Sequence, residues 1–216
     1  MLPSNIVVCA DLAMDLFVSL DSMYEAIQVI PGTPSGKKFI GGPHGSFHSV
    51  RYKDRSKGCK IATSKDKKTF LPFLSGDLFW KGTSIHTKIS LKKMTIIGLV
   101  SYDDIEDAFR TVCDAVLSFI GASLSVDGIK TSNSVFSHNI GRQIIFSEYA
   151  LRERPEGLHV EYHDWIHSSM KIIIFHPDPR TKHTFSVRGT GSITQFSPSD
   201  MKTSEEAYEK MLKFLG

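Results

Sequence analysis

Two stretches of the chain begin with the same pattern. Residues 5–12 read NIVVCADL, and residues 133–140 read NSVFSHNI. Each begins with Asn, has Val two residues later, and ends with Asp or Asn followed by Leu or Ile. Val, Ile and Phe are enriched in β-strands, so each stretch predicts a strand. A chain that carries one strand pattern twice is expected to build two similar units around the two copies.

Similar elements are predicted after each of these strands. After the first come a helix over 16–30, strands over 46–53, 85–90 and 94–97, and a helix from about residue 103. After the second come a short helix over 143–151, strands over 171–175, 183–188 and 192–196, and a last helix near residue 203. The sequence therefore predicts an α+β fold of two strand–helix–strands–helix repeats, 1–125 and 126–216, related by a pseudo-twofold.

The first repeat is longer than the second. Asn5 lies 103 residues before Ala108, whereas Asn133 lies 74 residues before Ala207, a difference of 29. The extra residues are predicted to form an insertion over about 54–82. Its first part is Lys-rich and is expected to be a solvated loop, in which Lys65, Lys67 and Lys68 could contact phosphate groups.

Composition narrows the class of protein. The 216 residues are 41% apolar and 23% charged, as in soluble globular proteins, and no apolar run is long enough to cross a bilayer. The three cysteines include no CxxC pair, so we expect reduced intracellular thiols. The net charge of +3 is too small to indicate a nucleic-acid partner by itself.

Enzyme signatures are weak. HVEYHDWIH places His159, His163 and His167 four residues apart, but a continuous helix there is doubtful, and surface histidines are a better interpretation than a metal site. SVRGTGS lacks the phosphate-loop spacing and predicts a hairpin turn. No Ser/His/Asp arrangement has a local signature. We expect no enzyme activity, no metal and no cofactor.

The doubled strands suggest a binding face instead. Two such units would form one sheet with helices on one face, leaving the other free for a ligand. Asn5 and Asn133 would then place two amides near the centre of the free face. Amide groups can donate to the acceptors that A·T base pairs present in the minor groove of DNA.

At these residues the chain resembles the TATA-binding protein (TBP) family. NIVVCADL and NSVFS are similar to the openings of the two family repeats, DPRTKHTF to a turn of the second, and KKMTIIG to a strand of the first. The resemblance implies a curved antiparallel saddle sheet with helices on its convex face. It also implies an initiation factor that binds A·T-rich promoter DNA through the minor groove, together with a B-type initiation factor and RNA polymerase.

The resemblance also implies which residues contact DNA. Asn5, Asn133, Val7 and Val135 match the central residues of the family's DNA-binding face. Phe47 and Ile89 match the two wedges that unstack base pairs in the first repeat. Trp165 and Ile166 stand at the upstream wedge of the second repeat, and Val187 or Arg188 at its downstream wedge. The predicted set is completed by Arg51, Lys92, Lys93, Thr95, Ile97, Thr194 and Phe196.

Some features depart from the family. Phe196 stands where the family keeps Thr, and the helix around AFRTVCDAVLSF has a single Arg where family members are basic. The style of divergence suggests a protein encoded by a large DNA virus, acting inside the cell in the nucleus or a viral factory, or packaged in the virion. Two alternatives stay open: a protein-interaction or virion structural module that has lost DNA binding, and the recognition arm of a nucleic-acid enzyme.

Overall fold

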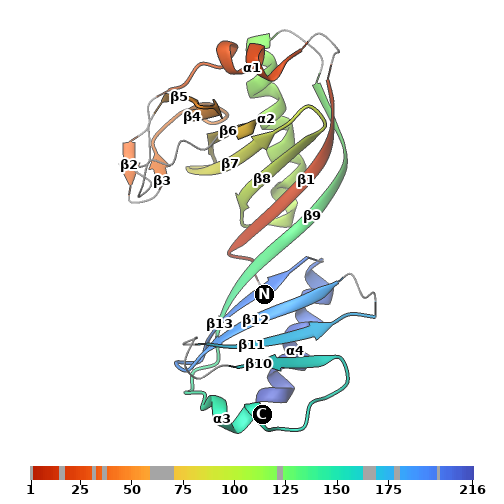
Figure 1. Ribbon diagram of the computed structural model, residues 1–216. Coiled ribbons are helices and arrows are strands. Elements are labelled where there is room, and N and C mark those ends of the chain that lie inside the picture. Colours follow the sequence, from red (N-terminus) through yellow and green to blue (C-terminus); the bar gives the residue numbers. More distant parts are fainter. Residues whose placement is uncertain are drawn as a thin grey trace. The chain divides into compact units, whose positions relative to one another are not determined.

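The computed structural model describes residues 2–14, 18–30, 33–35, 38–58, 71–120, 124–162, 169–177, 181–198 and 200–216. The chain divides into two compact units (Figure 1). Unit 1 comprises Met1–Ile6 and Thr131–Gly216, and unit 2 comprises Val7–Lys130. The division falls within strands β1 (Asn5–Met14) and β9 (Leu124–Asn139), and the expected boundary between residues 125 and 126 also lies within β9.

Unit 2 is a sheet with two α-helices. After β1 come α1 (Leu20–Ala26), β2 (Thr33–Ser35), β3 (Lys38–Ile40), β4 (Phe47–Lys53), β5 (Arg55–Gly58), β6 (Leu71–Trp80), β7 (Thr83–Ile89), β8 (Lys93–Leu99), a 3₁₀ turn (Tyr102–Asp104) and α2 (Ile105–Ile120). The strand order is β1-β8-β7-β6-β4-β5, and the pairs from β8 to β5 are antiparallel. Strands β2 and β3 pair with each other.

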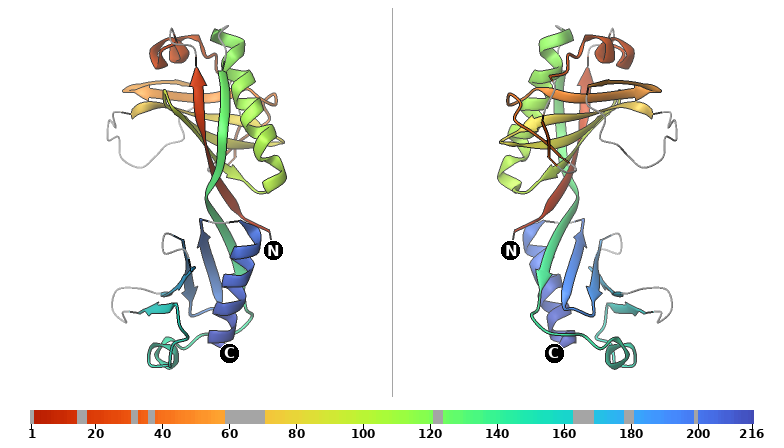
Figure 2. Two further views of the ribbon diagram at one scale, coloured as in Figure 1. Left: turned by 90° about the vertical axis from the view of Figure 1, so that its right-hand side faces the viewer. Right: turned by 90° about the vertical axis from the view of Figure 1, so that its left-hand side faces the viewer.

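Local sequence explains the helix starts in unit 2. The Ser19 side chain accepts a hydrogen bond from the Ser22 N–H (3.0 Å), which caps the N-terminus of α1. Helix α2 has Glu106 and Asp107 in its first turn, where carboxylates complement the helix dipole. Its Phe109, Val112 and Val116 are buried. Helix α2 thereby covers one face of the sheet (Figure 2).

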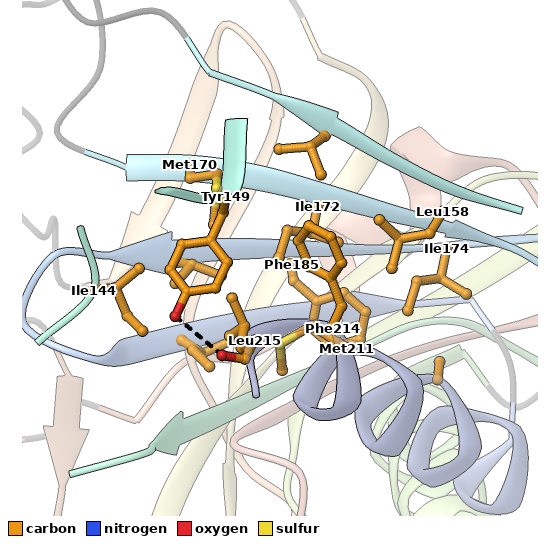
Figure 3. Close-up of a cluster of buried hydrophobic side chains, with 14 residues drawn as sticks. Ile144, Tyr149, Leu158, Met170, Ile172, Ile174, Phe185, Met211, Phe214 and Leu215 are labelled. Carbon is orange, nitrogen blue, oxygen red and sulfur yellow. Dashed lines mark hydrogen bonds between the residues drawn. The ribbon is translucent and has the colours of Figure 1, made fainter. Parts of the chain in front are cut away.

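Unit 1 is built in the same way. After β9 come α3 (Phe146–Ala150), β10 (Leu158–Glu161), β11 (Ser169–Phe175), β12 (Lys182–Arg188), β13 (Ser192–Ser197) and α4 (Met201–Leu215). The strand order β10-β11-β12-β13-β9 is antiparallel throughout. Buried residues of β11 and β12, among them Ile172 and Phe185, pack with Met211 and Phe214 of α4 (Figure 3). Tyr149 of α3 donates to the Leu215 carbonyl at the end of α4 (3.0 Å).

The observed elements refine the predicted ones. Helix α1 begins at Leu20, later than predicted, and β9 begins at Leu124, earlier than predicted. The predicted insertion over 54–82 contains two strands of the sheet, β5 and β6, so this range is not simply a loop. Lys65, Lys67 and Lys68 lie outside the described residues. Both units have a strand–helix–strands–helix order; their origin by duplication stays an interpretation. Within the described ranges, none of the helices has the length and apolarity to cross a membrane.

Candidate nucleic-acid interface

The sheet face opposite the helices is the candidate interface, and we call it the open face. Side chains alternate between the two faces of a strand. In β1, Ile6 and Val8 are fully buried, whereas Asn5 and Val7 are partly exposed. The apolar series thus lies under the helices, and Asn5 and Val7 project from the open face.

Strand β9 follows the same rule in unit 1. Ser134 and Phe136 are fully buried, whereas Asn133 and Val135 are partly exposed. The next residue on the buried side, His138, stacks on Tyr208 of α4 with ring centroids 3.9 Å apart, which fixes that side as the helix side. The open face therefore carries Asn133 and Val135, as the sequence predicts.

The two asparagines belong to the same unit. The Ser4 N–H donates to the Val135 carbonyl (2.7 Å), which places the start of β1 beside β9 in unit 1. Asn5 follows Ser4 directly, and Asn133 precedes Val135 by two residues. The Oδ1 atom of Asn5 is buried and has no hydrogen-bond partner among the described residues. An unpaired buried polar atom costs free energy. Oδ1 is an acceptor, so the donor that could pair with minor-groove acceptors is the Nδ2 group of Asn5 and not this atom.

Cross-strand pairing gives unit 2 an ordered open face. Residues directly opposite each other on neighbouring strands share a face. One row runs Arg51, Ser75, Lys88 and Thr95 across β4, β6, β7 and β8. The adjacent row runs Ser49, Asp77, His86 and Ile97 across the same strands. Arg51, Thr95 and Ile97, all predicted to contact DNA, are thereby brought onto one surface.

Unit 1 presents a comparable open face. Phe196 of β13 is 41% exposed and lies between Val135 of β9 and Thr184 of β12. In the next row Thr194 lies between Ser137 and Ser186. Val135, Thr194 and Phe196 are three of the predicted contact residues, so the strand pairing groups them as an exposed apolar and hydroxyl-bearing patch.

Basic residues differ between the open face and the helix side. Arg51, Lys92, Lys93 and Arg188 are exposed, and none forms an ion pair within the described ranges. By contrast, Lys53 and Arg55 pair with Asp21 of α1, at 3.0 and 2.7 Å. The pKa of Asp21 is lowered, chiefly because Lys53 donates hydrogen bonds to its carboxylate. The cations near the open face are therefore free to meet phosphate, whereas those near α1 hold the unit together.

Two predicted wedge residues are placed wrongly by the sequence. Phe47 is 1% exposed and Ile89 is 0% exposed, and both lie on the helix side of the sheet. Ile89 pairs with Leu74 and Met94, both buried, so the open-face position in β7 is the preceding residue, Lys88. At Phe47 a register shift between Phe47 and Ser49 changes the alternation. A shift of one residue moves a side chain to the opposite face, and neither residue can reach DNA on the open face.

The wedge residues of the second repeat have different outcomes. Trp165 and Ile166 lie outside the described residues, as do His163 and His167 of the histidine motif. Arg188 is exposed and opposite Ser169. Its neighbour Val187 is fully buried and cannot act as a wedge. Phe196, which was predicted only as a contact residue, is an exposed aromatic side chain beside Val135 on the open face of unit 1. Phe175, opposite Lys182 on the same face, is also exposed, at 46%.

Four polar residues on the open face of unit 2 form a hydrogen-bonded chain that the sequence did not indicate. The Ser75 hydroxyl lies 3.1 Å from Nε2 of His86, and Nδ1 of His86 lies 2.8 Å from Asp77 Oδ1. Ser49 donates to Asp77 Oδ2 (2.7 Å). Burial raises the pKa of Asp77, but the hydrogen bonds from His86 and Ser49 outweigh it, so the net pKa is lowered. The pairing of β6 with β7 and with β4 brings these residues together.

Comparison with known proteins gives a fold and no family. No family model and no curated protein sequence matches the chain. Among solved structures it is similar to Methanococcus jannaschii TBP, with a TM-score of 0.62 and 16% sequence identity over 99% of this chain and 96% of that chain. At that identity the similarity establishes the fold alone. A TBP-like fold is therefore confirmed, whereas the pseudo-twofold repeat, the saddle shape and the helices on a convex face stay predictions.

Proposed function

We propose that this chain is a TBP-like transcription initiation factor that binds A·T-rich promoter DNA through the minor groove. One observation carries the proposal: the repeated Asn-x-Val residues, Asn5 with Val7 and Asn133 with Val135, lie on the open face of a TBP-like fold. A purely structural surface gives no reason for two amides at matched positions. Minor-groove recognition does, because A·T pairs present only acceptors there and Asn side chains can donate to them.

The other open-face residues fit the same task. Val7, Val135, Thr95 and Thr194 provide the small apolar and hydroxyl groups that can lie against sugars and base edges. Arg51 and Lys93 in unit 2, and Arg188 in unit 1, add exposed cations that are not ion-paired within the described part of the chain. Most of the affinity would come from phosphate neutralisation, so we expect it to fall steeply as salt rises.

DNA bending is expected to be weaker at unit 2 than at unit 1. Bending requires apolar side chains that enter base steps, at a cost of a few kcal/mol per step. Phe47 and Ile89 are buried under the helices of unit 2, so neither supplies a wedge there. Phe196 of unit 1 is exposed and can do so. We propose an asymmetric bend centred on Phe196.

Partners and location follow from the proposed role. A TBP-like initiation factor would dock a B-type initiation factor and RNA polymerase, would need no cofactor, and would act in the nucleus or in a viral factory. Exposed charged residues on α2, such as Glu106 and Arg110, are candidate contacts for such partners. An origin in a large DNA virus remains part of this proposal.

A second candidate function is a protein-interaction or virion structural module that retains the fold without binding DNA. The burial of Phe47 and Ile89 favours it, because a surface that has lost its wedges has lost the means to deform DNA. The matched positions of Asn5 and Asn133 favour the DNA-binding function, because their amide N–H groups can donate to the acceptors of A·T pairs, whereas a structural module has no use for them.

A titration distinguishes the two functions. The protein is titrated into A·T-rich and G·C-rich duplexes of equal length at several salt concentrations, with energy transfer between dyes at the duplex ends reporting bending. The proposed function predicts tighter binding to the A·T-rich duplex and a shortened end-to-end distance. Equal and negligible binding to both duplexes would exclude promoter binding and support the structural module.

A further inference from the structure

The chain Ser75–His86–Asp77–Ser49 has the connectivity of a nucleophile, a base and a carboxylate that orients the base. We propose that it forms a serine-hydrolase-type site for short carboxylic esters, with Ser75 as nucleophile and His86 as general base. This activity goes beyond DNA binding and does not depend on it. Three contacts carry the inference: Ser75 Oγ to His86 Nε2 (3.1 Å), His86 Nδ1 to Asp77 Oδ1 (2.8 Å), and Ser49 Oγ to Asp77 Oδ2 (2.7 Å).

The strand geometry explains why the contacts form. Ser75 and Asp77 are two residues apart on β6, so both project from the open face. His86 lies directly opposite Asp77 on β7 and diagonal to Ser75. An imidazole between them can therefore reach both side chains without leaving the sheet surface. Because these residues lie on paired strands, the sheet itself limits their movement.

The proton positions follow from the acceptors. An ionised Asp77 can only accept, so His86 must carry its proton on Nδ1 to bond with it. Nε2 is then the free lone pair that faces the Ser75 hydroxyl. This is the tautomer in which a histidine can remove a proton from a serine. Ser49 occupies the second carboxylate oxygen, which holds Asp77 in the orientation that serves His86.

The proposed ester hydrolysis consumes only the ester and water. Ser75 Oγ attacks the ester carbonyl as its proton passes to His86 Nε2, giving a tetrahedral oxyanion. The bond to the alcohol breaks, the alcohol takes the proton from His86, and an acyl ester of Ser75 remains. Water then attacks that ester, again giving its proton to His86. The carboxylic acid leaves as Ser75 regains the proton.

Cations and access complete the proposed site. Arg51 and Lys88 lie opposite Ser75 on the two neighbouring strands and share its face, so the developing oxyanion would form between two positive side chains. The side chains of His86 and Asp77 are 35% and 28% exposed, and Ser75 retains 8% exposure. A small ester can therefore approach from the open face. Asp77 and Ser49 act as positioning residues, because they reach the nucleophile only through His86.

A second Ser–His contact, in unit 1, lacks the solvent access of the proposed site. In unit 1, Ser197 Oγ lies 2.6 Å from His183 Nδ1, but Ser197 is fully buried and also contacts Ser204 Oγ at 2.7 Å. Burial lowers the pKa of His183, which favours a neutral structural imidazole. Ser197 and His183 are both buried, so a substrate cannot approach them from solvent, and we expect no reaction there.

The test uses the full chain and no DNA. The folded protein is incubated with a fluorophosphonate probe, the adduct is located by peptide mass spectrometry, and hydrolysis of p-nitrophenyl acetate is followed in parallel. We expect one adduct per chain, on Ser75, and no adduct when the protein is denatured before the probe is added. Ser75→Ala should abolish it, and His86→Asn should slow labelling by about 100-fold or more. The matched control is Ser186→Ala, an open-face serine that also faces a lysine, Lys171, and should label like wild type.

Asp77→Asn tests the positioning role. It should lower the maximal rate of labelling while leaving unchanged the probe concentration that gives half that rate, and circular dichroism should report an unaltered fold. A folded wild-type protein that gives no adduct on Ser75 would overturn the proposal. So would an adduct that forms equally fast in the His86→Asn variant. DNA titrations are independent of either result, so failure here leaves the DNA-binding proposal standing, and the reverse also holds.

Discussion

The two faces of the sheet differ in burial: one packs under the helices, and the other is the proposed DNA-binding face. On the helix side of unit 2, Phe47 and Ile89 are almost completely buried. On the open face, Arg51 and Lys88 lie close to them in sequence but reach solvent. The difference teaches that the residue type alone does not determine the role of a position in this fold. Strand alternation and register determine which face a side chain lies on, and that face determines its role.

Truncation of Phe47 should have the largest effect. Phe47→Ala removes a fully buried ring and should lower the free energy of unfolding by about 3–5 kcal/mol, measured by urea denaturation. Phe196→Ala is the matched control on the open face and should cost far less. If Phe47→Ala kept wild-type stability but lost DNA binding, Phe47 would be a wedge residue and the assignment of the two faces would be wrong.

Phe196 should matter for DNA more than for stability. Phe196→Ala should weaken binding to an A·T-rich duplex by about tenfold, or about 1.4 kcal/mol, and should reduce the bend, because it removes the exposed aromatic wedge. Energy transfer across the duplex measures the bend. An unchanged bend in the variant would show that Phe196 does not enter a base step.

The charge contrast predicts a difference in salt dependence. Arg51→Gln removes an open-face cation and should reduce the slope of log affinity against log salt by about 0.9. Arg55→Gln is the matched control, because Arg55 is bound to Asp21 and Glu25 rather than free for phosphate. Affinities measured from about 50 to 200 mM salt give the slope. Equal salt slopes for the two variants would show that ion-paired and unpaired cations contribute alike to DNA binding.

The smallest expected effect is a pH dependence of the free energy of unfolding that comes from His183, on the helix side of unit 1. Burial lowers the pKa of His183 below its ordinary 6.5, which the neighbouring His176 reinforces and Asp200 opposes. As pH falls through 6.5, the unfolded chain binds a proton before the folded chain does, so the free energy of unfolding should decrease. His183→Gln should flatten this dependence between pH 7 and pH 5. An unchanged dependence in the variant would assign it to other groups.

Turn residues made part of the fold predictable. Strands β12 and β13 were predicted as a hairpin across the turn Gly189-Thr190-Gly191. Strand β6 was missed because LPFLSGDLFW contains Pro and Gly and is buried over most of both faces, which removes the period of two. Asn5 and Asn133 project from the face opposite the helices because neighbouring Ile6 and Ser134 are buried. That these two residues contact DNA stays a prediction.

The site was less predictable than the fold. Phe47 was assigned to the wrong face because a register shift cannot be read from one strand alone. Ile89 was wrong by a single residue, which is enough to exchange it with Lys88. The Ser75–His86–Asp77 chain was missed because Ser75 and Asp77 meet His86 only through the pairing of β6 with β7. A Ser-x-Asp pair in a strand facing a histidine strand is the one signal that could have indicated it.

The most direct test of the open face as the DNA-binding surface uses its two amides. The Asn5→Ala/Asn133→Ala double variant is compared with wild type for binding to A·T-rich and G·C-rich duplexes. We expect wild-type preference for the A·T-rich duplex and loss of that preference in the variant, at about 1–3 kcal/mol for each amide, with an unchanged free energy of unfolding. A stable double variant that keeps the full A·T preference would contradict the account.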